Sequence, residues 1–559
     1  MRNIEYQTDL CVIGGGLSGL CCAIAAARGG IKTVLVHDRA VLGGNASEEI
    51  RMWICGAHGK DNRETGIIEE IVLENFYRNP SSNYSVWSMI LYEKAICEEN
   101  LTLLLNTSCF DAKMNGEKIK SVKAWQSNAE TYHIIEAKYF ADCSGDSVLS
   151  TLTGAEFMYG REAKSEFSET IPPDKADKKT MGMSCLFQIR ETDRKCTFIP
   201  PKWAYVYETD DDLPYKDHDI NNNFWWIELG GEWDCVHDTD RCRDELLKIV
   251  FGVWDHMKNK GEHGADNWEL EWIGFLPGKR ESRRYVGKHI ITQNDVEAGG
   301  KFSDTVAFAG WTMDDHFPEG FNYRDGHPTI YHPAPSPWGI PLRSLVSKNI
   351  ENLCFAGRNI SVTHAALSSS RVMATCAVMG QALGTAVSLA AKAGCAIDEV
   401  DINALQQKLM RDDCFIPGFE RRLPDLTLNS DVNCEIVRNG SDRGEENLWV
   451  GKEGDFLEYS LKSPEKISRV RLVFDSDLNR TCQNMPCNYP LKQIEKLPKT
   501  LVKDFDIETV LGDKKEIVSV RDNHQRFVTI DINKTADKVR FVPKFSGCGE
   551  FRVFDFEIE

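Results

Sequence analysis

The 559-residue sequence predicts an α/β fold: a Rossmann-like domain interrupted by an inserted α+β domain and followed by an all-β jelly-roll sandwich. A glycine-rich turn lies between a short apolar strand and an Ala-rich helix, almost at the N-terminus. Apolar strand-like runs then recur near residues 139–142 and 353–356, far apart in the chain. Short alternating strands at close spacing fill the last 130 or so residues, which is typical of a β-sandwich.

The first element is a nucleotide-binding fingerprint. Residues 9–13 form a predicted buried strand, 17–28 a helix and 33–36 a second strand. Gly14 and Gly16 lie in the turn between the first strand and the helix, and Ser18 and Gly19 lie at the start of the helix. In such a G-x-G-x-x-G turn the glycines permit the tight turn, the approach of a pyrophosphate and close helix packing. Asp38 follows the second strand, where an acid accepts hydrogen bonds from a ribose. A Gly-rich turn of an unrelated domain is the alternative, and the strand, helix and acid argue against it.

Four ordered motifs extend this pattern over roughly residues 8–395. They are Gly43-Gly44 after Asp38, residues 141–146, residues 277–284, and residues 352–358 with 371–386. Together they resemble the FAD-dependent oxidoreductase family related to fumarate reductase, succinate dehydrogenase and heterodisulfide-reductase flavoproteins. The resemblance implies FAD as cofactor and these contact residues: Gly14, Gly16, Ser18, Gly19, Asp38, Arg39, Gly43, Gly44, Asn45, Ser47, Gly357, Arg358, Arg371 and Gly380. The succinate dehydrogenase class carries a flavin-linked histidine near Asn45, so its absence here predicts non-covalent FAD.

Catalytic candidates are the polar residues beside these motifs: His58, His364, Arg283 and Arg51. A neutral imidazole can serve as a base near pH 7, which favours the two histidines. A structural histidine bonded to a loop carbonyl is the alternative for each, and Arg283 is equally suited to an ion pair with Glu281 or a phosphate contact. His316, in a Pro/Gly-rich loop, is placed near the active-site mouth; its spacing from other ligands matches no metal template, so no metal is predicted.

The predicted organisation has five segments. Residues 1–165 and 275–410 form the FAD-binding domain, residues 166–274 the aromatic-rich substrate cap, residues 411–427 a linker and residues 428–559 the sandwich. Residues 224–229 read as a cap strand. The sandwich resembles discoidin-like or galactose-binding-like modules at residues 439–449 and 474–480, which implies glycan binding; oligomerisation or simple packing is the equal alternative.

Composition limits the partners. A formal net charge of −19 argues against nucleic acid or an anionic membrane as a main partner. The apolar residues 372–393 are predicted to form a buried core helix. The first predicted strand begins close to residue 1, so a secretory signal is not expected. The 19 cysteines include no C-x-x-C, so an iron–sulfur cluster is not supported, and their positions in predicted core elements suit a cytoplasmic protein. Cys482 and Cys487 form a C-x4-C pair that is interpreted as structural, with a metal site completed by Cys548 as the alternative.

These observations predict an FAD-dependent oxidoreductase that transfers a hydride between non-covalent FAD and a small polar molecule, either a sugar derivative or a hydroxy or organic acid. The electron acceptor and any homo-oligomer stay open. A flavin-dependent lyase or isomerase without net redox is one alternative, and a carbohydrate-binding protein with a vestigial flavin fold is another.

Overall fold

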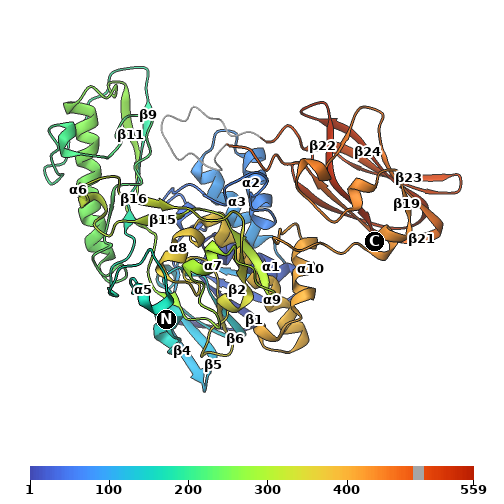
Figure 1. The fold of residues 1–559 in the computed structure, drawn as a ribbon, viewed down its shortest axis with the longest axis horizontal. Helices are drawn as coiled ribbons and strands as arrows, with labels where there is room; N and C mark the ends of the chain where they lie inside the picture. Colours follow the sequence, from blue (N-terminus) through green and yellow to red (C-terminus); the bar gives the residue numbers. More distant parts are fainter. Residues whose placement is uncertain (482–496) are drawn as a thin grey trace.

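The computed structural model describes residues 1–481 and 497–559. Three parts follow one another across the molecule in Figure 1: the cap around α6, the central nucleotide-binding domain, and the C-terminal β domain. The predicted fold class is confirmed, because a largely parallel sheet with helices forms the centre and the C-terminal sheet is antiparallel. The predicted pair Cys482 and Cys487 lies outside the described residues.

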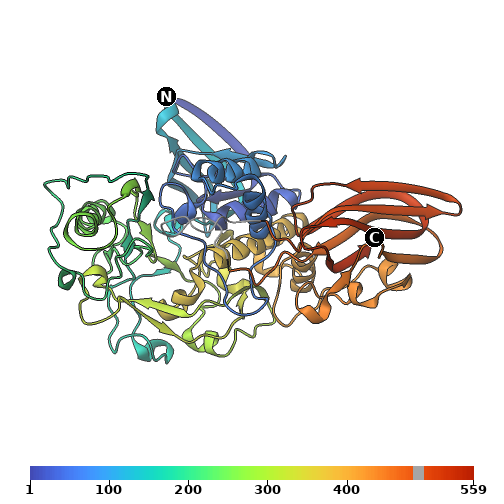
Figure 2. The same cartoon turned by 90° about the horizontal axis from the view of Figure 1, so that it is seen from above.

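The central sheet has the strand order β3-β2-β1-β6-β5-β4, and β18 pairs with the end of β6. Strands β1 (Arg2–Ile13), β2 (Thr33–Val36), β3 (Leu101–Leu104), β6 (Thr131–Asp142) and β18 (Leu353–Phe355) run parallel. The antiparallel hairpin β4 (Thr107–Asn115) and β5 (Lys118–Gln126) joins the edge. Only the last residues of β1 are fully buried; its first half projects beside the hairpin in Figure 2.

Two helices pack closely beside the sheet. Helix α1 (Leu17–Arg28) contacts α9 (Met373–Ala393), where a Cβ on Gly380 would lie 2.0 Å from the carbonyl oxygen of Ser18. Glycine is therefore required at 380 for close packing. Helix α9 has the length and composition of a membrane span, but it is buried inside the domain, as predicted for a core helix. The other helices here are α2 (Ile67–Arg78), α3 (Tyr84–Ile96), α4 (Val148–Thr153), α5 (Lys164–Phe167), α7 (Gln293–Glu297), α8 (His364–Ser370) and α10 (Ile402–Arg411).

The cap has its own aromatic core around α6 (Thr239–Asp255), and the rings of Phe187 and Phe224 stack with centroids 4.0 Å apart. The predicted strand 224–229 is wrong in extent: only β10 (Glu228–Leu229) is a strand, because Trp225 and Trp226 lie in a turn. Short strands complete the cap and join it to the central domain: β7 (Phe157–Met158), β8 (Met183–Ser184), β9 (Phe187–Glu191), β11 (Trp268–Ile273), β12 (Gly278–Lys279), β13 (Arg284–Tyr285), β14 (Thr305–Ala309), β15 (Met313–His316), β16 (Thr329–His332) and β17 (Trp338–Pro341).

The C-terminal domain is built on two long strands, β21 (Leu457–Phe474) and β24 (Phe527–Ser546). The sequence predicts residues 456–461, 470–474, 527–530 and 539–542 as separate strands. Strand β21 joins the first two segments and β24 the last two, and register shifts near Ser460 interrupt the pairing of β21 with β24. Aromatic rings fill the core, with the centroids of Phe505 and Phe541 5.4 Å apart. The remaining elements are α11 (Asp425–Asn429), β19 (Asp431–Val432), β20 (Trp449–Gly451), β22 (Val502–Leu511), β23 (Lys514–Val520) and β25 (Phe551–Ile558).

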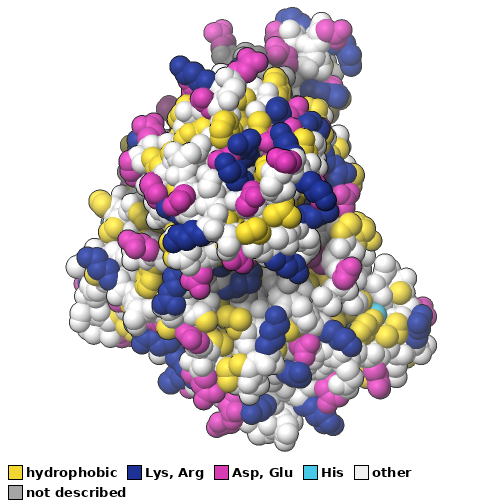
Figure 3. Space-filling model, turned by 90° about the vertical axis from the view of Figure 1, so that its right-hand side faces the viewer, with side chains coloured by type: hydrophobic (Ala, Val, Ile, Leu, Met, Phe, Trp, Pro, Cys, Tyr) yellow, Lys and Arg dark blue, Asp and Glu magenta, His cyan; other side chains and the backbone are white. Residues whose placement is uncertain are grey.

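Buried ion pairs join the C-terminal domain to the central domain. Arg480 donates to Glu69 of α2, which also accepts from Ser476 at 2.7 Å, and Arg526 pairs with Asp413 at 3.2 Å. The segment 474–480, which carried the glycan-module resemblance, is thus part of this interface. On the face seen in Figure 3, acidic and basic side chains are interspersed.

Candidate active site

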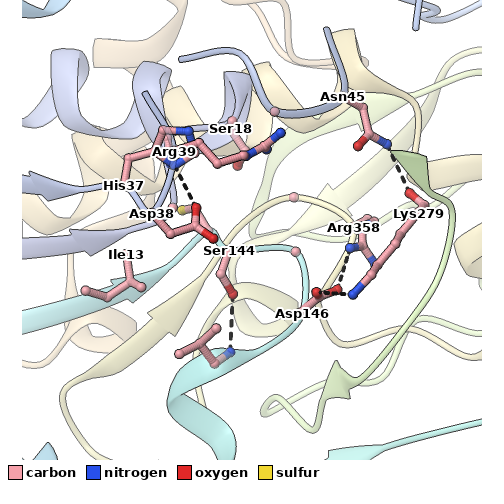
Figure 4. A pocket seen from close by; sticks show the side chains of 18 of the residues that line it. Ile13, Ser18, His37, Asp38, Arg39, Asn45, Ser144, Asp146, Lys279 and Arg358 are labelled. Carbon is pink, nitrogen blue, oxygen red and sulfur yellow. Dashed lines mark hydrogen bonds and ion pairs between the residues drawn. The ribbon is translucent and has the colours of Figure 1, made fainter. Parts of the chain in front are cut away.

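A cavity of about 340 Å³ lies at the carboxyl ends of the central parallel strands (Figure 4). The fingerprint turn, the end of β2, the loop at Gly43 and the segment after β6 form its walls, and Arg358 closes one side. In open α/β sheets this edge is where ligands bind, because the loops there leave a crevice between them. The cavity is therefore the candidate cofactor site.

The backbone of the fingerprint turn requires glycine. Gly14 has φ +103°, and a Cβ there would lie 2.5 Å from the carbonyl oxygen of Cys143. Gly43, with φ +113°, forms a parallel bridge to Gly16. A Cβ on Gly16 would meet nothing closer than 3.8 Å, so a ligand can approach its backbone. The turn and the Gly43 loop thus form one cradle.

The sequence analysis missed His37, which lies between β2 and Asp38. The Gly15 amide donates to its Nδ1 (2.9 Å) while its Nε2–H donates to the Val41 carbonyl (3.0 Å). Burial and the nearby Arg39 cation lower the pKa of His37 to about 4, so the ring is neutral at pH 7. A neutral imidazole thus holds the turn, while Asp38 is exposed at the cavity.

A second residue that the sequence analysis did not single out is Asp146. Its carboxylate pairs with Lys279 (2.8 Å) and Arg358 (2.6 Å), as Figure 4 shows. Burial favours the neutral acid, but the two cations outweigh it and hold the pKa of Asp146 well below its usual range. The carboxylate is therefore ionised, and it fixes both basic side chains at the junction of two cavities.

Most predicted cofactor residues lie together in this cavity. Its wall includes Gly14, Gly16, Ser18, Asp38, Arg39, Gly43, Gly44, Asn45, Gly357, Arg358 and Arg371. Gly19, Ser47 and Gly380 lie outside the wall. A Cβ on Gly19 would be 1.9 Å from the carbonyl oxygen of Gly14, so this glycine serves packing. Ser47 is fully buried, and its hydroxyl has no hydrogen-bond partner among the described residues.

The cradle suits FAD on two structural observations. The N-terminus of α1 has no side-chain cap, so its free amides point to the cavity and favour a phosphate. The buried hydroxyl of Ser18 at this end lacks a hydrogen-bond partner within the described chain. A pyrophosphate would therefore find donors at Gly16 and Ser18, and Asp38 is placed for a ribose.

A second cavity of about 270 Å³ adjoins the first. The two share five lining residues: Asn45, Lys279, Arg358, Arg371 and Met373. Aromatic rings from the central domain and cap line the second one, namely Trp53, Trp225, Trp311 and Tyr331. Among its described lining residues, four are Lys or Arg and one, Asp314, is acidic.

A series of ion pairs and hydrogen bonds connects charged side chains and His316 at this second cavity. Arg280 lies 3.3 Å from Glu228, and His316 Nδ1 lies 2.7 Å from the same carboxylate. His316 Nε2 is 3.3 Å from Asp314, which also pairs with Arg371 at 3.1 Å. Burial raises the pKa of Asp314, but His316 and Arg371 outweigh it and keep this carboxyl ionised. The Nε of Arg371 is buried with no hydrogen-bond partner in the described part of the protein.

The structure places His364 away from both cavity walls. Its Nδ1–H donates to Glu281 (2.9 Å) and its Nε2–H to Asp315 (3.0 Å). Burial disfavours the charged ring, but Glu281 and Asp315 outweigh burial and raise the pKa of His364 to about 10. The prediction of a neutral base at this position is therefore corrected: His364 is a buried cation at pH 7.

The other predicted catalytic residues also lie outside the second cavity wall. His58 is exposed and packs behind Trp311, with ring centroids 4.1 Å apart. Arg51 lies between the rings of Tyr84 and Trp272, 4.4 Å from each centroid, and so joins α3 to the cap. Arg283 lies 5.7 Å from the Phe157 ring, and the arginine that pairs with Glu281, besides His364, is Arg284 (3.4 Å).

The parallel sheet, the glycine cradle and the cavity at the strand ends define a nucleotide-binding protein with a site suited to a dinucleotide cofactor. The family model described as FAD dependent oxidoreductase matches residues 9–409, and this chain belongs to that family. Within 68 residues it is 37% identical to glycerol-3-phosphate dehydrogenase of Mycobacterium leprae, which covers 12% of each chain. The chain thus spans about an eighth of that curated relative's length.

Solved structures with similar folds are distant. E. coli quinol fumarate reductase FrdA is 12% identical over 73% of this chain and 75% of that chain, with a TM-score of 0.29. The p-nitrophenol 4-monooxygenase PnpA of Pseudomonas putida is 10% identical over 73% and 86%, with a TM-score of 0.32. The family 32 carbohydrate-binding module of Streptococcus pneumoniae EndoD is 16% identical over 23% and 92%, with a TM-score of 0.18.

Proposed function

We propose that this FAD-dependent oxidoreductase transfers a hydride between FAD and a small organic acid, either a hydroxy acid or a sugar acid. The supporting observation is the charge of the second cavity. Four cations line it, and their three carboxylate partners, Asp146, Glu228 and Asp314, leave one positive charge in excess before His316 is counted. A substrate carboxylate would balance this charge.

Arg371 is the proposed carboxylate-binding residue. Nη2 of Arg371 donates to Asp314, whereas the buried Nε of Arg371 has no partner among the described residues. Leaving such a buried donor unpaired costs about 1–3 kcal/mol. Arg371 lines both cavities, so a carboxylate bound there would lie next to the cofactor site. The indole rings of Trp53, Trp225 and Trp311 would cover the carbon skeleton, as aromatic faces do for sugars.

His316 is the proposed proton-transfer residue. Glu228 orients its ring through Nδ1 at 2.7 Å, and Nε2 makes the longer contact, 3.3 Å, to Asp314, which lines the second cavity together with His316. A base held by a second group is the arrangement expected for acid–base catalysis. When bound, FAD supplies the hydride chemistry, and this chain orients the substrate and moves its hydroxyl proton.

Anaerobic mixing with 2-hydroxy acids and sugar acids tests the proposal. An acid substrate should bleach the flavin, and the neutral aldose or alcohol of the same skeleton should bleach it at least tenfold more slowly. Product formation without bleaching would instead favour the lyase or isomerase. Equal rates with acids and neutral sugars would contradict the carboxylate assignment.

Arg371→Met gives a residue-level test. It should raise KM for the acid at least tenfold because a carboxylate loses a charged partner. Arg343→Met is the matched control, since Arg343 pairs with Asp304 and is half-exposed outside both cavity walls. An unchanged KM in Arg371→Met would remove this residue from substrate binding.

A further inference from the structure

A separate cluster of ligand side chains lies in the cap. Asp210, His218, His256 and His263 each direct one ligand atom to a common centre, and these four atoms lie within 4.8 Å of one another. None of the four lines either cavity described above. They come from the loop before β10 and from the end of α6 with the turn that follows it.

Four of the six distances between these ligand atoms are close to those of a tetrahedral metal site. Asp210 Oδ1 lies 3.0 Å from His256 Nε2, 3.5 Å from His263 Nε2 and 3.6 Å from His218 Nε2. His256 Nε2 and His263 Nε2 are 3.1 Å apart. Ligands about 2.0–2.1 Å from a tetrahedral Zn²⁺ are separated by about 3.3 Å, so these contacts have the length of tetrahedral edges.

Outer hydrogen bonds orient two of the imidazoles. His256 Nδ1–H donates to the carbonyl of Tyr207 at 3.0 Å, and His218 Nδ1–H donates to the carbonyl of Lys216. With Nδ1 protonated, each Nε2 lone pair faces the centre, which is the tautomer that a metal requires. A Cβ on Gly261 would lie 2.1 Å from His263 Nε2, so this glycine leaves room for the third ring.

We propose that these four residues bind one structural Zn²⁺. Three imidazoles and one carboxylate in a tetrahedron suit zinc, whereas Ca²⁺ and Mg²⁺ prefer sites built from oxygen. Four protein ligands fill the tetrahedron, and this is the mark of a structural site rather than a catalytic one. His256 is 1% exposed and Asp210 is 73% exposed, so the carboxylate side provides the entry path for the ion.

The ion would fasten the cap loop that leads to the substrate cavity. His218 and Asp210 lie in this loop, and His256 and His263 belong to the α6 end against which it packs. Trp226 Nε1–H donates to the carbonyl of Asp217, next to His218. Trp225, in the cavity wall, directly precedes Trp226 in the chain, so the metal would restrain one wall of the proposed substrate site.

Metal analysis of the full-length flavoprotein tests this proposal. After incubation with zinc sulfate and desalting, the wild type should hold about one Zn²⁺ per chain, and His256→Ala less than a tenth of that. His237→Ala is the matched control and should keep its zinc, because His237 is an exposed cap histidine bonded to Asp234. Flavin absorbance shows that the central domain of each variant is folded.

Two results on the wild type keep the test decisive if the variants fold poorly. Bound Co²⁺ should be displaced stoichiometrically by Zn²⁺, and a chelator should lower the cap's thermal transition. Wild type that holds no more zinc than His256→Ala would overturn the proposal. The cluster would then be a group of histidines hydrogen-bonded around Asp210.

Discussion

The charge on His364 makes a quantitative prediction about stability. Glu281 and Asp315 bracket the ring at 2.9 and 3.0 Å and raise its pKa from the ordinary 6.5 to about 10. The folded protein therefore holds this proton between pH 6.5 and 10, whereas the unfolded chain releases it. The resulting stabilisation is fully present below pH 6.5 and is lost as pH rises toward 10.

One proton of difference changes the free energy of unfolding by about 1.4 kcal/mol per pH unit. Between pH 7 and 9 the loss of this proton on unfolding should lower the free energy of unfolding by about 3 kcal/mol. His364→Gln removes the titrating group, so the stability difference between wild type and variant should shrink by about that amount over the same interval.

Urea unfolding measures this stability difference when it is followed by the rise in fluorescence as FAD is released. The FAD signal reports unfolding of the domain that contains His364. His289→Gln is the control: His289 contacts one carboxylate, Asp295, at 3.1 Å and is partly exposed. A wild-type-minus-variant difference that is equal at pH 7 and pH 9 would refute a charged imidazole between the two acids.

Two further substitutions test the fold and the cofactor site. Gly14→Val should remove most of the bound FAD, measured as flavin absorbance per chain, because its φ of +103° and the Cys143 carbonyl 2.5 Å away exclude a side chain. Arg480→Met should lower unfolding free energy by about 3–5 kcal/mol by leaving Glu69 buried and unpaired, as measured by urea denaturation. Arg78→Met, at the partly exposed end of the same helix, should cost less than about 1 kcal/mol, and equal losses would contradict the interface assignment.

The cofactor site could be predicted because its determinants are local. A buried strand, positive-φ glycines and a helix start follow one another within a few residues. Each of these elements has a residue pattern that can be recognised in the sequence. The role of His37 could not be predicted because the glycine pattern does not include this position. His37 directly follows the second strand, and its contact with the turn depends on the fold.

The substrate cavity could not be predicted in the same way. Its residues come from separate short strands and turns of the cap and central domain, and two-to-four-residue strands carry too little alternation to show which face is buried. His364 was preferred for its residue type, although the acids that fix its charge lie 83 and 49 positions away. In the sandwich, the sequence predicts residues 456–461 and 470–474 as separate strands, but residues 457–474 form the continuous β21, in which residues 462–466 are exposed.

Strand β15 shows how the fold separates the two buried histidines. Successive side chains of a strand point to opposite faces, so Asp314 and His316 reach the second cavity while Asp315 turns to His364. One short strand thus supplies a carboxylate to each charge network. His364 is held by two acids outside the cavity wall, whereas Arg371 shares one acid and keeps a free donor. Arg371, and not His364, is therefore the residue that can bind an anion. Asp315→Asn should change the pH dependence of the unfolding free energy more than it changes the affinity for an acid substrate.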